Sequence, residues 1–133
     1  MEALERLGDL NYLAIVVAAV AYFAIGAIWY QPFAFGKVWA EKSGIDMSQS
    51  PNPMIFVATF LAYFVMVWAI AYLGPVDALG GLEVGLLASL GFVGPTLFVN
   101  TLYQKKPWAV YWIDKVFNVI GFVAAGIIIG IWQ

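Results

Sequence analysis

The sequence predicts an all-α polytopic membrane protein, with four transmembrane helices arranged as two antiparallel hairpins and a short interfacial helix after the first span. Its 133 residues are 64% hydrophobic and only 11% charged, which lies outside the usual balance of soluble domains. The uncharged residues are grouped in blocks, each close to the roughly 20 residues that cross a bilayer. We therefore expect a single domain, residues 1–133, with spans at about 11–31, 54–74, 82–103 and 108–132.

The first predicted span ends at a group of aromatic residues. Trp29 and Tyr30 are typical of the headgroup region, and Pro32 moves the residue before it out of helical geometry. The segment 33–43 then mixes large apolar side chains with lysines, a pattern that predicts a helix lying in the membrane interface. The residues of this interface motif are Trp29, Tyr30, Pro32, Phe35, Gly36, Lys37 and Trp39.

The second span follows the turn sequence SQSPNP, and the third contains a proline well inside its apolar run. Pro95 has no N–H to donate, so the carbonyl of Gly91 loses its usual helical partner. Together with Gly94, these residues predict a break in the third helix.

The fourth span contains Asp114 and Lys115 side by side. Adjacent residues on a helix point about 100° apart, so each of the two needs its own partner. Antiparallel pairing of the third and fourth spans would put Asp114 level with Thr96, and Asn118 one turn deeper near the break. A stripe of small residues, expected to serve helix packing, continues this helix: Gly121, Ala125, Gly126 and Gly130.

Two interpretations of these polar residues stay open. In the first, Lys115 extends to lipid phosphate while Asp114 faces the bundle and accepts a hydrogen bond from Thr96. In the second, Asp114, Asn118, Thr96 and Asn100 line a polar pocket or ion path opened by the helix break. The glycine and alanine faces could likewise pack within the chain or between copies of it.

Charge and composition exclude several classes of site. The sequence has no Cys and no His, which excludes disulfides, thiolate nucleophiles and His-ligated metals, and we expect no metal or cofactor. A net charge of −2 gives no case for nucleic acid. Arg6 is alone on the side of the termini, whereas Lys37, Lys42, Lys105 and Lys106 lie in the first and third loops. The positive-inside rule therefore predicts both termini outside and these two loops in the cytoplasm.

The segments WYQPFAFGKVW, GFVGPTLFVNTLYQKKPW and IDKVFNVIGFVAAGIIIGIW resemble the small prokaryotic membrane proteins grouped as domain of unknown function 1761. The resemblance covers 11–132 and implies four membrane-spanning helices in a prokaryotic inner membrane, with no known biochemistry. The positions that match the patterns of the family are Trp29, Tyr30, Pro32, Phe35, Gly36, Lys37, Trp39, Gly91, Phe92, Pro95, Thr96 and Asn100.

Two classes of function fit these observations best. A channel or transporter would hold a small ion or solute at the shallow polar site and would need a homo-oligomer to enclose a path. A structural or accessory protein would instead bind membrane lipids or a larger membrane complex through the same lysines and aromatic residues. Enzymatic activity is the weakest interpretation, because without His or Cys only Asp114, Lys115 and tyrosines could act as acids or bases.

Overall fold

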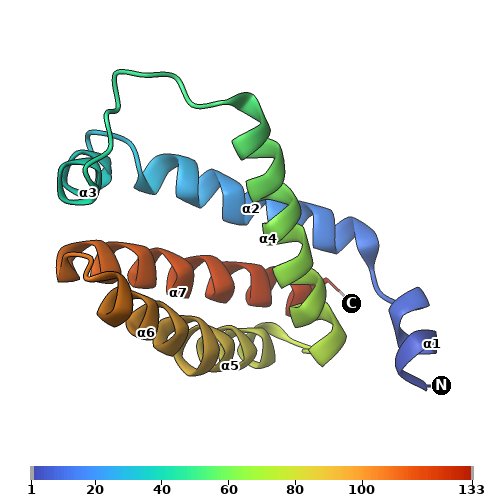
Figure 1. The fold of residues 1–133 in the computed structure, drawn as a ribbon. Helices are drawn as coiled ribbons and strands as arrows, with labels where there is room; N and C mark the ends of the chain where they lie inside the picture. The colour runs from blue at the N-terminus through green and yellow to red at the C-terminus, as the bar shows by residue number, and fades with distance from the viewer. Residues whose placement is uncertain (1, 133) are drawn as a thin grey trace.

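Four long apolar helices form the body of the protein, in a computed structural model that describes residues 2–132 (Figure 1). They are α2 (Tyr12–Trp29), α4 (Pro53–Leu73), the continuous stretch Ala78–Gln104, and α7 (Trp108–Ile131). Short helices precede and follow the first of them, α1 (Glu2–Gly8) and α3 (Gly36–Ser43). The predicted all-α fold class is confirmed, and the four helices have the length and composition of the spans of a multi-pass membrane protein.

The third long stretch contains a π-helical turn. It consists of α5 (Ala78–Ala88), the π-helix η1 (Ser89–Val93) and α6 (Gly94–Gln104). The backbone N–H of Gly94 donates to the carbonyl of Ser89, five residues earlier. The break predicted at Gly91, Gly94 and Pro95 thus takes the form of a widened turn. One extra residue in a turn rotates the following helical face by about 100°, so α6 presents a different face from the one that α5 would continue.

The ends of the helices follow the capping chemistry of the sequence. Asn11, Asn52 and Asp77 precede α2, α4 and α5, and each side chain accepts a backbone N–H of the first turn at 2.7–3.0 Å. Gly44 and Gly74 end α3 and α4 with φ of 73° and 72°, a left-handed conformation that favours glycine.

Helix α7 lies at the centre of the packing. It contacts α2, α3, α4, α5, η1 and α6, and Figure 1 shows α2 on one side of it and the α5–α6 stretch on the other. The hydrophobic core is built from residues of α2, α4 and α7: Ala14, Ile15, Ala18, Ala19, Tyr22, Val67, Ile70, Ala71, Phe117, Phe122, Ala125 and Ile129.

The small residues of α7 are used inside the chain. The predicted packing residues Gly121, Ala125, Gly126 and Gly130 are all buried. Gly126 faces Gly81 of α5, and a Cβ on either glycine would collide with the carbonyl oxygen of the other. Gly121 lies under the ring of Tyr22 of α2, with 2.6 Å between an ideal Cβ and the ring carbon Cζ. These glycines therefore set the distance from α7 to its neighbours on both sides.

Helix α4 joins the core through its C-terminal half. Its buried residues are Val67, Ile70 and Ala71, whereas the residues from Met54 to Val57 are all about half exposed or more. Figure 1 shows α4 crossing α2 obliquely, after the extended segment 44–52. The first predicted hairpin is therefore splayed, whereas the second is closely packed where α5 lies against α7.

Candidate functional site

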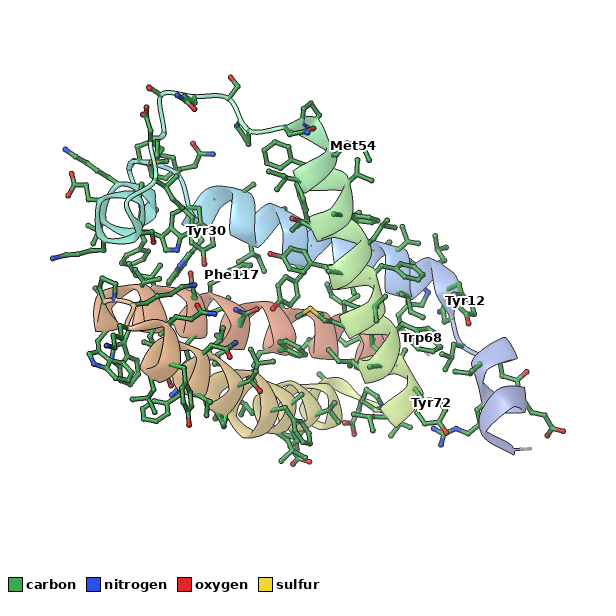
Figure 2. The ribbon with its side chains drawn as sticks, in the orientation of Figure 1. Tyr12, Tyr30, Met54, Trp68, Tyr72 and Phe117 are labelled. Carbon is green, nitrogen blue, oxygen red and sulfur yellow. The ribbon has the colours of Figure 1, made fainter. Side chains whose placement is uncertain are left out.

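Asp114 lies in the second turn of α7, half-buried against the end of α2. The hydroxyl of Tyr30 donates a hydrogen bond of 2.5 Å to its Oδ1 atom. Figure 2 shows Tyr30 and Phe117 between α2 and α7, and their rings meet edge to face with centroids 5.4 Å apart. Aromatic rings thus pack beside the carboxylate, and a phenol at the end of the neighbouring helix donates a hydrogen bond to it.

The turn after α2 holds Tyr30 in this position. The indole N–H of Trp29 donates to the carbonyl of Ile113, 3.1 Å away, which places the end of α2 directly against α7. The ring of Phe35 stacks on Trp29 at 4.4 Å. A Cβ on Gly36 would collide with the carbonyl of Tyr30, so only glycine allows the chain to turn back this closely. Trp29, Phe35 and Gly36 of the predicted interface motif therefore hold Tyr30 against Asp114.

Trp39 of α3, in the connection between α2 and α4, packs against the site. Its ring meets that of Tyr30 at 5.4 Å and 71°. Its Nε1 atom is buried and, among the residues that the structure describes, has no hydrogen-bond partner. The side chain lies close enough to Asp114 for its N–H to interact electrostatically with the carboxylate, although without hydrogen-bond geometry. A buried N–H without an acceptor is costly, so this atom is the most unusual polar group of the site.

Asn118 lies one turn deeper on α7 and connects the site to the core. Its Nδ2 donates to the carbonyl of Asp114 at 2.8 Å, and its Oδ1 accepts from the hydroxyl of the fully buried Tyr22. The ring of Tyr63 from α4 packs on Tyr22 with centroids 4.3 Å apart. We call the group formed by Tyr22, Tyr30, Trp39, Asp114 and Asn118 the Asp114 site.

Lys115 has partners of its own, as the helical spacing predicts. Its ammonium lies 4.8 Å from the ring centroid of Trp112 and 5.5 Å from that of Tyr111. Its aliphatic stem packs at Gly94, where an ideal Cβ would lie 3.3 Å from the Lys115 Cε. The ammonium within electrostatic range of Asp114 is instead that of Lys106, in the turn before α7.

The carboxylates of the described residues are not grouped. Between residues 2 and 132, no three His, Cys, Asp or Glu side chains come together as a group that could hold a metal ion. The Asp114 site has one carboxylate, and its other polar atoms are phenol, amide and indole groups. Its chemistry is therefore that of hydrogen bonding around a single carboxylate.

Comparison with known protein families matches residues 13–130 to the family described as "Protein of unknown function (DUF1761)". The chain belongs to the DUF1761 family. No curated protein and no solved structure matches it. The family resemblance predicted from the sequence is confirmed, and every residue of the Asp114 site lies inside the region that matches DUF1761.

Two of the predicted site residues of this DUF1761 protein lie elsewhere. Thr96 and Asn100 are exposed on α6, and the Thr96 hydroxyl donates to the carbonyl of Phe92 at 2.6 Å. The π-helical turn explains the difference, because the rotation that it adds turns this face of α6 away from the one that α5 packs on α7. The predicted alignment of Thr96 with Asp114 assumed a regular α-helix.

The partners that the sequence analysis did not pair with Asp114 all come from α2 and α3. Tyr30 and Trp39, both already in the predicted interface motif, lie at Asp114, and Tyr22 donates to its neighbour Asn118. A signal for this pairing exists in this DUF1761 sequence. When α2 and α7 are paired antiparallel, a phenol of α2 faces Asp114 and another faces Asn118.

Proposed function

We propose that this small membrane protein binds a small ion or polar solute at the Asp114 site, at one end of its helix bundle. The observation that carries the proposal is the environment of the carboxylate. Asp114 lies within a candidate membrane span, is half-buried, and has one phenolic hydrogen bond and no salt bridge among the described residues. Ionisable groups in such positions are rare and commonly mark paths or binding sites for substrates and ions.

The proposal includes assembly of several copies, as in a channel or transporter. The interior of one chain is filled by the core and by the glycine contacts of α7, so one chain has little room for a path. A path past Asp114 therefore requires a surface that two or more chains enclose. We place the end that carries Asp114 in the cytoplasm, because Lys37, Lys42, Lys105 and Lys106 are at that end.

A structural or accessory role is the second candidate, and one observation favours it. The deeper half of the site is closed, since Asn118 bonds both to Tyr22 and to the backbone of α7. Holding α2 on α7 is a sufficient role for such a network, and that role needs no ligand. In that role the protein would bind lipids or a larger complex, and the Asp114 carboxylate would stay in contact with Tyr30 alone.

Flux through reconstituted vesicles distinguishes the two candidates. We would measure proton flux with an entrapped pH dye and glycerol flux by light scattering, for the unmodified protein, Asp114→Asn and the matched control Glu83→Gln. Glu83 is exposed in the middle of α5 and lies outside the site. Binding and transport predict that Asp114→Asn alone changes one of these fluxes by about tenfold or more. Equal fluxes for all three proteins would refute the transport proposal.

Oligomeric state is a separate test of the same proposal. Native mass spectrometry of the protein extracted in mild detergent gives the number of chains and any retained small molecule or lipid. A closed oligomer would support an enclosed path. A monomer would contradict it and would favour the accessory role.

A further inference from the structure

The polar atoms of the Asp114 site define what kind of group can complete it. The Trp39 N–H is buried and needs an acceptor, while the carboxylate of Asp114 accepts a bond from Tyr30 at Oδ1 and can accept more. An ammonium group can only donate, and a phosphate or carboxylate can only accept. A hydroxyl group does both, so a hydroxyl placed between Trp39 and Asp114 satisfies each of them.

A set of exposed lysines lies at the same end of the molecule as this site. Lys37 and Lys42 are on α3, and Lys105 and Lys106 form the turn between α6 and α7. Figure 1 shows α3 and this turn at the same end of the molecule. Lys106 lies within electrostatic range of Asp114 itself. We call these four lysines the basic rim; it presents the charge that an anion such as a phosphate requires.

The depth of the site matches that of a lipid headgroup. Asp114 is in the second turn of a candidate span, and the rings of Trp108 and Trp112 are exposed on the same turns of α7, as in an aromatic belt. A lipid phosphate lies at this level and would meet the basic rim, and a hydroxyl attached close to it would reach the carboxylate.

We propose that the Asp114 site binds the headgroup of an anionic lipid that carries a free hydroxyl, with phosphatidylglycerol as the simplest example. The phosphate lies at the basic rim, and a glycerol hydroxyl accepts from Trp39 Nε1 and donates to Asp114. This inference rests on the proposed function in taking the Asp114 carboxylate as a ligand-binding group, and it names a lipid headgroup in place of a free ion or solute as the ligand.

The test compares two lipids of equal headgroup charge, only one of which carries free hydroxyls. Phosphatidylglycerol and phosphatidylmethanol have the same charge and can carry the same acyl chains, but only the first has free hydroxyl groups. We would titrate each into the detergent-extracted protein and measure bound lipid by native mass spectrometry. We expect phosphatidylglycerol to bind about fivefold to tenfold more tightly, the effect of one or two added hydrogen bonds. Equal binding of the two lipids would overturn the inference.

Variants show whether the selectivity arises at this site. Asp114→Asn and Trp39→Phe should each reduce the preference for phosphatidylglycerol to near unity, whereas Lys106→Gln should weaken both lipids together. Trp112→Phe is the control, because its ring lies on the Lys115 side of α7. Asp114→Asn tests the preference on its own even if Trp39→Phe does not fold, and Lys106→Gln, at an exposed residue, tests the phosphate contact separately. A preference that survives in Asp114→Asn would place the lipid elsewhere and overturn the inference.

Free glycerol phosphate, added as a competitor, identifies the source of the ligand. Weak competition supports a lipid, and displacement of the lipid at equal concentration would overturn the lipid assignment in favour of a soluble polyol phosphate.

Failure of this inference is distinguishable from failure of the proposed function. If Asp114→Asn changes flux while the unmodified protein binds the two lipids equally, only the ligand class is wrong. If Asp114→Asn changes neither the flux nor the lipid preference, the proposed function and the ligand class are both wrong.

Discussion

Replacing Gly85 by alanine should loosen the contact between α5 and α7. An ideal Cβ at this position lies 2.6 Å from the carbonyl oxygen of Phe122 and 2.8 Å from the Cα of Val123. These are backbone atoms, so no side-chain rotation relieves the collision. Ordinary contact begins near 3.4 Å, and the helices must therefore separate by about 0.8 Å.

The expected cost follows from this separation. A gap of about 0.5–1 Å removes a quarter to a half of the dispersion energy of each contact that it opens. Overpacking of this kind costs about 1–3 kcal/mol, and the gain from placing alanine for glycine in a helix recovers about 0.5–1 kcal/mol. We expect Gly85→Ala to lower the free energy of unfolding by about 1–2 kcal/mol.

Unfolding in mixed micelles of increasing SDS content, followed by far-UV circular dichroism, measures this change. Gly91→Ala is the matched control, since Gly91 is in the same continuous stretch and the nearest atom to its ideal Cβ is Leu87 Cδ1 at 3.9 Å. The control should be as stable as the unmodified protein or slightly more stable. If the two variants unfold at the same SDS fraction, the close approach of α5 and α7 is not a determinant of stability.

Three further changes test other contacts. Tyr22→Phe removes the donor to Asn118 and should cost about 1 kcal/mol, measured by the same unfolding assay. Arg6→Gln removes both the hydrogen bond to the Tyr72 carbonyl and the cation–π contact with that ring. Amide exchange in α1 should then be faster, by an amount equivalent to about 0.5–1 kcal/mol. Lys105→Gly should raise the free energy of unfolding by about 1 kcal/mol, because Lys105 has φ of 54°.

Each of these changes has a control of similar chemistry. Tyr103→Phe alters a tyrosine that is 85% exposed and should leave stability unchanged. Glu5→Gln alters the charge of α1 without touching Tyr72, and Lys106→Gly places glycine where φ is not positive. Stability of the Tyr22 variant equal to that of Tyr103→Phe would contradict the role of the phenol. Unchanged amide exchange in α1 would contradict the prediction for Arg6→Gln. A loss of stability would contradict the prediction for Lys105→Gly.

The sequence predicted the helices better than their pairing. Blocks of uncharged residues and their caps, such as Asn11 and Asn52, depend on local chemistry, and the structure follows them. The different partners of Asp114 and Lys115 also follow from local geometry, because neighbours on a helix point apart.

The partners of Asp114 could not be predicted in the same way. Neighbouring helices of a hairpin were expected to share their polar groups, which led to Thr96. The π-helical turn changes the face that α6 presents by one residue, and nothing in the composition of that segment specifies this shift. The choice between packing within a chain and between chains was equally open, since a glycine stripe suits both. In the structure, Gly126 of α7 packs against Gly81 of α5 in the same chain.

The order of the helices along the chain, with α7 after the other three long ones, has a consequence for biosynthesis. The helices that enter the membrane before it have few contacts with one another apart from those of α2 with α4, and most of their packing awaits α7. Until that helix arrives, Tyr22 and Tyr30 have no carboxamide or carboxylate to bond, and the glycine face of α5 is uncovered. A nascent chain stalled before α7 should therefore remain a loose set of helices and be a substrate for membrane proteolysis, whereas a chain that includes α7 can close its core.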